Sequence, residues 1–177
     1  MAALVKTPLN DAAIAVLHAG DKVLINGIIY AARDRAHKEL CRLLQERQPL
    51  PMELSGQVIY YAGPCPAKPG QAVGSVGPTT GSRMDPYTPA LLDQGLKGMI
   101  GKGQRSPAVV ESMISNKAVY FAAIGGAGAL LAMSVKEATV VAFPQLGAEA
   151  LFRFSVEDFP AIVAIDSRGN NLYAMGS

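Results

Sequence analysis

Hydroxyl and cationic side chains gather in one short segment of the chain, Gly77–Asp85, which has the sequence GPTTGSRMD. The hydroxyls of Thr79 and Thr80 can donate or accept hydrogen bonds, and the guanidinium of Arg83 is a planar fork of donors that matches a carboxylate or a phosphate. The glycines let backbone N–H groups approach a ligand closely. The segment therefore predicts a recognition loop for a small anion, with an ordinary solvated turn as the alternative interpretation.

Three further cationic side chains stand at the ends of predicted elements. Arg33 ends a β-rich run, and Lys102 and Arg105 belong to the glycine-rich segment GKGQR that follows another such run. Side chains of this kind that converge with Arg83 on one pocket suit a dicarboxylate, because each contact fixes orientation and adds charge-assisted hydrogen bonds. The alternative is that these residues are solvated surface charges, as most Arg and Lys side chains are.

Other kinds of site find little support in the sequence. His18 and His37 are the only histidines, and neither has an acidic or cysteine neighbour at metal-ligand spacing, so we expect no metal site built by this chain alone. No Ser-His-Asp or Cys-His arrangement indicates a nucleophile. Residues 125–128 (GGAG) lie between a predicted strand and a predicted helix, but they match neither nucleotide-binding motif, GxGxxG or GxxxxGK(S/T). They are more typical of close helix–strand packing.

Length and composition fit a single domain that covers residues 1–177. Half of the residues are hydrophobic and 17% are charged, which excludes a disordered chain and suggests that some apolar surface meets a partner. The net charge of +2 is too small to predict nucleic-acid binding. Two cysteines favour a reducing cytoplasm over a secreted disulfide scaffold, and we expect neither a signal peptide nor a membrane span.

The hydrophobic pattern predicts strands that alternate with helices. The expected helices are 11–17, 34–48, 88–94, 107–116 and 129–138, and the expected strands are 22–32, 57–62, 96–100, 118–124, 139–143, 150–156 and 161–166. Asn10 and Ser106 are candidate N-caps, and Gly27 is a candidate β-bulge. A long loop after Gly63 leads into Gly77–Asp85, and loops of that length in a compact domain are usually functional or disordered. The alternation predicts an α/β domain with a largely parallel, buried sheet.

Several motifs follow one another in the order of a known family: GDKVLINGIIYAARDRAHKEL, GQVIYYAGP, GPTTGSRMDPYT, GLKGMIGKGQRS and AVYFAAIGGAGALLA. With these motifs the chain resembles, from Gly20 to Tyr173, the β subunit of the class I fumarate hydratase and L(+)-tartrate dehydratase family, which is equivalent to the C-terminal domain of the single-chain enzymes. The resemblance implies a swivelling β/β/α-type fold. It also implies a hydro-lyase that reversibly adds water to the C=C bond of a C4 dicarboxylate, either fumarate/malate or L-tartrate/oxaloacetate.

The resemblance further implies a 4Fe-4S cluster whose open iron binds a substrate carboxylate and hydroxyl. Such a cluster needs three cysteine ligands, whereas this chain has two cysteines, neither in a cluster motif. In the family the ligands belong to the α subunit or the N-terminal domain. The chain is therefore expected to be half of an enzyme, inactive without an α subunit, and the exposed partner surface would also allow a homodimer when the chain is isolated.

Carried over motif by motif, the resemblance implies that Arg33, Arg83 and Lys102 bind the substrate carboxylates and that Thr80 helps to orient the substrate. Thr79 is expected nearest the reacting carbon. A threonine hydroxyl is a poor base, so Thr79 would need activation by a neighbouring anion, an aspartate of the α subunit.

Three residues remain outside this core set. His37 is interpreted as a packing or interface residue, with a proton relay as the alternative, and Arg105 as a secondary substrate contact. Asp85 is interpreted as a helix cap. The loop itself is expected to be only partly ordered or solvent-exposed in the isolated chain. The competing hypothesis for the whole chain is a non-catalytic dicarboxylate-binding or assembly module.

Overall fold

The computed structural model describes residues 1–123 and 127–175, in which strands and helices alternate through much of the chain. The strands are β1 (Ala3–Lys6), β2 (Lys22–Ala31), β3 (Val58–Tyr60), β4 (Gly98–Gly101), β5 (Val119–Ala122), β6 (Val135–Ala142) and β7 (Leu151–Ile165). The α-helices are α1 (Asp11–Ala15), α2 (Asp34–Gln45), α3 (Thr88–Asp93), α4 (Pro107–Asn116), α5 (Gly128–Ala132) and α6 (Leu172–Met175). Two 3-10 segments, η1 (Gly81–Met84) and η2 (Pro144–Glu149), complete the described elements.

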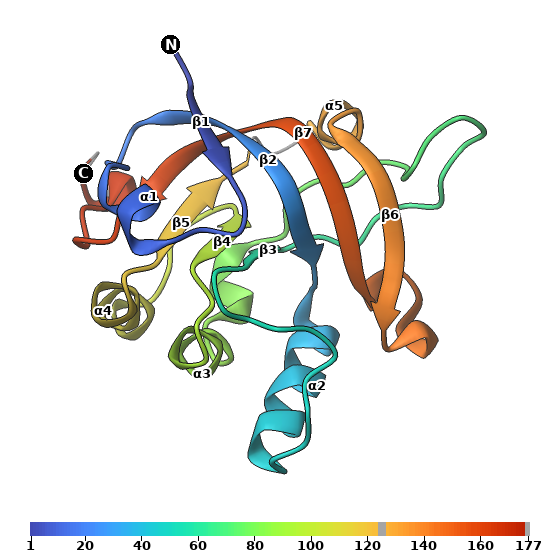
Figure 1. Cartoon of the computed structure of the whole chain (residues 1–177), viewed down its shortest axis with the longest axis horizontal. Coiled ribbons are helices and arrows are strands. Elements are labelled where there is room, and N and C mark those ends of the chain that lie inside the picture. The colour runs from blue at the N-terminus through green and yellow to red at the C-terminus, as the bar shows by residue number, and fades with distance from the viewer. Residues whose placement is uncertain (124–126, 176–177) are drawn as a thin grey trace.

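The strands of the described residues form one sheet in the order β1-β2-β3-β4-β5-β7-β6, and β2 also pairs with β7. This second pairing closes β2, β3, β4, β5 and β7 into a barrel (Figure 1). Pairing is parallel from β1 through β5, as predicted, but β7 runs antiparallel to β2, β5 and β6. The domain is therefore of the α/β class, as predicted, but its sheet contains both parallel and antiparallel pairs and is not simply the largely parallel sheet that was expected.

The central strands are buried on both faces, and successive side chains alternate between two apolar clusters. Tyr60 and Phe121 belong to one cluster, and their neighbours Ile59, Tyr61 and Tyr120 belong to the other. The second cluster also contains apolar side chains of α2, α3 and α4, which lie below the sheet in Figure 1. Tyr61 and Tyr120 therefore face the helices, a direction that matters for the site described below.

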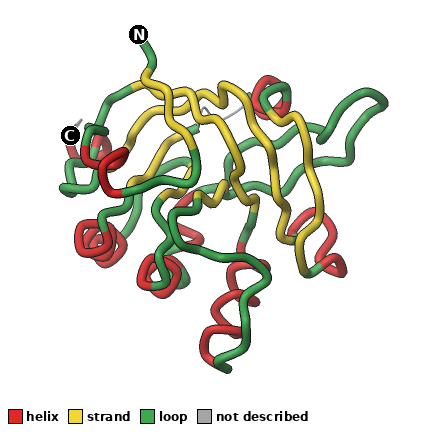
Figure 2. The backbone as a smooth tube through the Cα atoms, viewed as in Figure 1, coloured by secondary structure: helices red, strands yellow, loops and turns green. Residues whose placement is uncertain are grey.

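A long connection links β3 to η1 and extends past β6 before it returns to the sheet, as the loop trace in Figure 2 shows. α5 lies at the opposite side of the sheet from α2, α3 and α4 (Figure 1). None of the helices in the described residues has the length and apolar character needed to cross a membrane.

Several local predictions are confirmed. The side chain of Asn10 accepts a hydrogen bond from Ala13 N–H at 2.8 Å, and that of Ser106 accepts one from Val109 N–H at 3.3 Å, so both residues are N-caps. Gly27 lies at a register shift between β2 and β7. Its φ is +114°, and a Cβ at this position would lie 2.5 Å from the Thr7 hydroxyl oxygen, so both the backbone conformation and the packing require glycine.

Other element predictions are wrong or incomplete. The helix predicted to run to residue 138 ends at Ala132, because Val135–Ala142 pairs with β7 as β6. The two strands predicted at 150–156 and 161–166 are one strand, β7, which continues through Asp158. Asp158 has a φ of +51°, and its N–H donates to the side chain of Asn26 at 3.0 Å. Strand β1 was not predicted, and α1 and α2 end earlier than predicted.

Candidate functional site

The candidate residues follow the carboxyl ends of three neighbouring parallel strands. Arg33 comes two residues after β2, Thr79 and Thr80 lie at the end of the long connection from β3, and Lys102 directly follows β4. Since β2, β3 and β4 pair in parallel, their carboxyl ends meet at one edge of the sheet. Ligands of open parallel sheets bind at such an edge.

Backbone hydrogen bonds join the Thr79 and Lys102 segments directly. Thr80 and Lys102 form an isolated parallel bridge, in which Lys102 N–H donates to Thr79 C=O at 3.3 Å and Gly81 N–H donates to Lys102 C=O at 2.7 Å. Thr79 N–H in turn donates to Tyr61 C=O at 2.7 Å. The backbone of the loop is thus tied to the sheet, while the side chains of Thr80, Arg83 and Lys102 are exposed. The loop Gly77–Asp85 was predicted to be partly ordered or exposed to solvent. Several of its side chains are exposed, but its backbone is hydrogen-bonded to the sheet.

Arg83 reaches across to the start of α2. Its Nε and Nη2 atoms each lie 3.0 Å from Oδ2 of Asp34, with Arg83 50% and Asp34 28% exposed in their side chains. This ion pair places the Arg83 guanidinium at the N-terminal end of α2, where Arg33 is the N-cap residue. The Nε atom of Arg33 is buried and has no hydrogen-bond partner among the described residues. The structure thus pairs the backbones of Thr80 and Lys102 and places Arg83 against Asp34, the residue that follows Arg33 in the chain.

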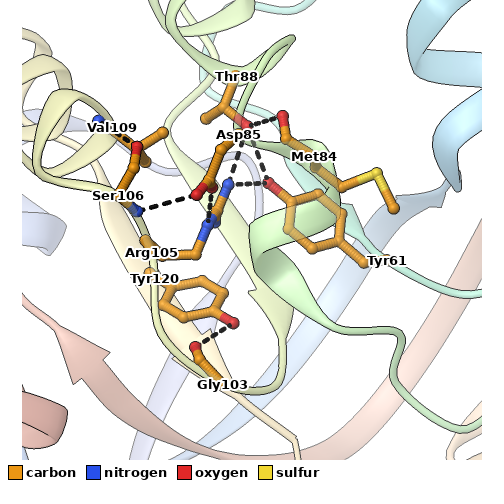
Figure 3. A network of polar contacts seen from close by, with 9 residues as sticks. All are labelled: Tyr61, Met84, Asp85, Thr88, Gly103, Arg105, Ser106, Val109 and Tyr120. Atoms are coloured by element: carbon orange, nitrogen blue, oxygen red, sulfur yellow. Dashed lines mark hydrogen bonds and ion pairs between the residues drawn. The ribbon is translucent and has the colours of Figure 1, made fainter.

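Arg105 does not belong to this exposed set. Its side chain is 0% exposed and donates from Nε to Asp85 at 2.7 Å and from Nη2 to the hydroxyls of Tyr61 and Thr88 at 3.1 and 2.9 Å (Figure 3). Its guanidinium carbon also lies 4.7 Å from the centre of the Tyr120 ring. The described geometry thus gives Arg105 internal partners, and its role as a secondary substrate contact stays a prediction.

Asp85 was expected to cap the helix that follows it, and this expectation is wrong. The N-cap position of α3 is occupied by Tyr87, whereas Asp85 accepts from Arg105 Nε and, at 2.9 Å, from Ser106 N–H. Asp85 therefore holds the residue that caps α4. Through these contacts Asp85 joins the end of the loop Gly77–Asp85 to the start of α4 (Figure 3).

His37 is fully buried on α2. Its Nδ1 lies 2.8 Å from the carbonyl oxygen of Arg33, which can only accept, so Nδ1 carries the proton and Nε2 does not. Its ring packs edge-on against Tyr61 with centres 5.3 Å apart and near Tyr87 at 6.1 Å. Burial is the main reason why the pKa of His37 falls from 6.5 to about 4, and the nearby Arg105 charge lowers it further, while the Arg33 carbonyl and Asp34 oppose the shift.

The low pKa of His37 predicts that the fold loses stability in mild acid. The unfolded chain takes up this proton near pH 6.5 and the folded chain only near pH 4, so the unfolded state binds more protons in that window. The free energy of unfolding should then fall by up to about 3 kcal/mol as the pH drops from 6.5 to 4, at 1.36 kcal/mol per pKa unit. Urea denaturation at a series of pH values measures this loss.

The His37→Leu and His37→Gln variants are the controls for that measurement, because neither side chain titrates. Each should lose less stability than the native chain between pH 6.5 and 4, while the lowered pKa of Asp166 and the other carboxyl groups act equally in all three proteins. Equal pH dependence in the native chain and in both variants would contradict the assignment of the low pKa to His37.

The residues that the structure describes do not fit a metal or iron-sulfur site. Cys41 lies half-buried on α2, with Sγ 3.7 Å from Tyr87 C=O, and Cys65 is exposed in the long connection after β3. Across the described residues, no three His, Cys, Asp or Glu side chains gather at metal-binding distance. Residues 125 and 126 of the GGAG segment lie outside the described residues, and so the interpretation of that segment as a packing feature is not tested.

Sequence reasoning missed the buried tyrosines that support the loops. Tyr61 and Tyr120 lie in apolar β-rich runs and carry no pattern that separates them from ordinary core residues. Tyr173 lies in α6, far along the chain, yet its hydroxyl accepts a hydrogen bond from Gly103 N–H at 3.1 Å. Only the number of tyrosines within or next to predicted strands could have drawn attention to them.

Comparison with protein families gives one match over nearly the whole chain. The family model described as Fumarase C-terminus matches residues 3–176. Fumarate hydratase 2 of Leishmania major is 40% identical over 157 residues, which cover 88% of this chain and 28% of that protein. The aerobic class I fumarate hydratase of Escherichia coli K12 is 40% identical over 154 residues, which cover 86% of this chain and 28% of the relative.

A shorter relative matches over most of its own length. A protein of Methanocaldococcus jannaschii that carries the provisional name L(+)-tartrate dehydratase subunit beta is 39% identical over 163 residues. These residues cover 89% of this chain and 84% of the relative. The chain thus spans little more than a quarter of the two fumarate hydratases but most of the subunit-sized relative.

Proposed function

The chain belongs to the Fumarase C-terminus family, and on this premise we propose that it is the β-type subunit of a hydro-lyase that reversibly adds water to a C4 dicarboxylate. Fumarate/malate and L-tartrate/oxaloacetate are the candidate substrate pairs, in keeping with the names of the relatives. The observation that carries the proposal is the meeting of Arg33, Thr80 and Lys102 at the carboxyl ends of neighbouring parallel strands. We also propose the swivelling β/β/α-type architecture for the domain.

Arg33, Arg83 and Lys102 are the proposed carboxylate clamps. The guanidinium of Arg83 is oriented by Asp34 and stays half exposed, which leaves it accessible to a ligand at the surface. Within the described residues the Lys102 ammonium has no ion-pair partner, and Lys102 is exposed. Two carboxylates of one small diacid can neutralise these cations, and bidentate Arg contacts would fix the orientation of the carbon chain.

Thr79 is the proposed proton-transfer residue, and Thr80 the residue that helps to orient the substrate. When water is removed, the Thr79 oxygen takes the proton from the substrate carbon next to a carboxylate as its own hydroxyl proton passes to an activating carboxylate, and the C–OH bond of the adjacent carbon breaks. The reverse direction returns both protons and re-forms that bond. Among residues 1–123 and 127–175, no carboxylate accepts a hydrogen bond from the Thr79 hydroxyl. We propose that the carboxylate that activates it is an aspartate of an α-type subunit.

The same partner is proposed to bind a 4Fe-4S cluster, because the two cysteines of this chain cannot supply three thiolate ligands. When bound, the cluster would supply an open iron for the substrate hydroxyl and carboxylate. Exposed apolar side chains are consistent with a partner chain: Leu130 on α5, Met133 directly after α5 and Val140 on β6 are 60%, 70% and 50% exposed.

The proposal is tested by anaerobic reconstitution of the chain with a cluster-bearing α-type subunit from the same organism. Hydration of fumarate or dehydration of L-tartrate is expected in the mixture and absent from either chain alone. A stable two-chain complex that converts none of the four diacids would contradict the proposal. Calorimetry on the single chain separates the alternative function, since tight binding of malate or tartrate without a partner would indicate a non-catalytic dicarboxylate sensor.

A further inference from the structure

Two loops carry most of the proposed substrate contacts, and they meet next to Lys102 at one small area. The loop with Thr79 and Arg83 touches the Gly101–Gly103 segment through the Thr80–Lys102 bridge. Among the described residues, two backbone hydrogen bonds, from Gly81 N–H and from Lys102 N–H, join these segments directly, while Asp85 is bonded farther along the chain, to Arg105 and Ser106. A ladder this short is easily displaced, so further contacts are needed to keep Lys102 at a fixed distance from Thr79.

The hydroxyl of Tyr120 lies where both loops pack against β5. It donates to Gly103 C=O at 3.0 Å (Figure 3). It is also the atom nearest to a Cβ added at Gly81. A Cβ at Gly101 would lie 3.2 Å from the same oxygen. The Tyr120 hydroxyl thus lies in the space beside Gly81 of the first loop and Gly101 at the end of β4, and it is bonded to Gly103 of the second loop.

The ring of Tyr120 cannot easily turn away from this position. The Arg105 guanidinium carbon lies 4.7 Å from its centre on one side, and Arg105 is itself fixed by Asp85, Tyr61 and Thr88. Burial raises the pKa of Tyr120, although the Arg105 charge works against this shift, so the hydroxyl stays protonated and remains a donor.

Gly103 is held from the other side as well. Its N–H donates to the hydroxyl of Tyr173 at 3.1 Å, while its C=O accepts from Tyr120. Both polar backbone groups of Gly103 are therefore bonded to tyrosine hydroxyls from β5 and α6. Because Gly103 directly follows Lys102, these two bonds restrict the backbone that carries the Lys102 ammonium.

We propose that Tyr120 is a positioning residue of the dicarboxylate site, whose hydroxyl sets the spacing between the Thr79–Arg83 loop and Lys102. The expected effect on substrate binding rests on the proposed function, whereas the effect of Tyr120 on the spacing of the two loops does not. Tyr120 acts through Lys102 and the Gly81 turn, and it need not touch the substrate.

The first test is the Tyr120→Phe variant in the reconstituted two-chain complex, which removes one oxygen atom and keeps the ring. Losing one buried hydrogen bond should raise KM for the dicarboxylate about 5- to 10-fold, while kcat stays within about 3-fold of the native value. The split is expected because the Lys102 contact holds substrate in the ground state as well as in the transition state. An unchanged KM would overturn the proposal.

A double-mutant cycle with Lys102→Met shows whether the effect runs through Lys102. If Tyr120 positions Lys102, Tyr120→Phe should raise KM by less than about 2-fold when Lys102 is already replaced. A general loss of packing would instead multiply the two single effects. Multiplicative effects would therefore overturn the proposal even if Tyr120→Phe alone raised KM.

The geometry is tested separately, without activity, by NMR hydrogen exchange of backbone amides in the single full chain. The Gly81 and Gly103 amides should exchange about 5- to 10-fold faster in Tyr120→Phe than in the native chain. Tyr60→Phe is the matched control, since Tyr60 is also buried on a central strand and donates to the carbonyl of Val76, outside both loops. Unchanged exchange in Tyr120→Phe, or an equal increase in both variants, would overturn the positioning role. A native complex without hydro-lyase activity would contradict the proposed function and leave this measurement decisive.

Discussion

The Thr79→Ala variant is expected to form the two-chain complex but to lose turnover by about 10²- to 10⁴-fold, the range for removing a group that transfers a proton in the reaction. The substitution should leave the loop in place, because the backbone of Thr79 is held by Tyr61 C=O and by Lys102 N–H. The defect should therefore appear in kcat more than in KM. Steady-state rates of fumarate hydration in the anaerobic complex measure it.

Two controls sharpen this prediction. Thr79→Ser keeps a hydroxyl at the same atom and should retain activity within about 10-fold of the native complex. Thr80→Ala removes the neighbouring hydroxyl, which is exposed and proposed only to orient substrate, and should raise KM with a smaller effect on kcat. Native kcat in Thr79→Ala, or equal losses in Thr79→Ala and Thr80→Ala, would remove Thr79 from its proposed role.

The Arg105→Met variant should lose about 3–5 kcal/mol of the free energy of unfolding, the range for taking one partner out of a buried ion pair. Methionine fills a similar volume, but it leaves the carboxylate of Asp85, 14% exposed, without its charge partner. The hydroxyls of Tyr61 and Thr88 also lose a donor. Urea denaturation at neutral pH measures the loss.

Arg83→Met is the matched control, because Arg83 also pairs with an aspartate but at the surface. Its pair with Asp34 should contribute less than about 1 kcal/mol, since exposed ion pairs are screened by water. In the double variant Arg105→Met/Asp85→Asn, the amide oxygen can still accept from Ser106 N–H and no isolated charge remains, so part of the lost stability should return. Equal destabilisation by Arg105→Met and Arg83→Met would contradict the buried clamp.

The two arginines show how far sequence reasoning reached. Arg83 and Arg105 both lie next to glycine-rich turns and were assigned to the same anion site, but one is half exposed and the other is completely buried. Nothing in the local sequence separates them, because burial depends on which distant segments pack above a residue. Arg105 is covered by Asp85 and Thr88 and by tyrosines of β5 and the end of β3, and only the folded chain brings these together.

The predictions for strands show the same division. The β-branched and aromatic residues of β2, β3 and β5 predicted strands, because those residue types favour the pleated backbone. Around β6 the sequence predicted a helix where the chain forms a strand, and it predicted two strands where β7 is one. In both places the strand bounds depend on pairing between β6 and β7, which the local sequence does not show. Pairing with β7 extended β6 back to Val135, and Asn26 of β2 supports the turn of the backbone at Asp158.

The sequence by itself determined what is local in the loop Gly77–Asp85: its residue types, the cations that precede and follow it along the chain, and the family that these motifs indicate. Tertiary structure alone decided which of those cations are exposed to solvent and which are buried with partners inside the protein. The reason is physical: a charged side chain keeps its charge in either place, but its environment is set by parallel strand pairing and by buried tyrosines from segments far apart in sequence. The Gly77–Asp85 loop thus exposes the side chains of Thr80 and Arg83, while buried Tyr120 and Arg105 pack against the loop from inside the protein.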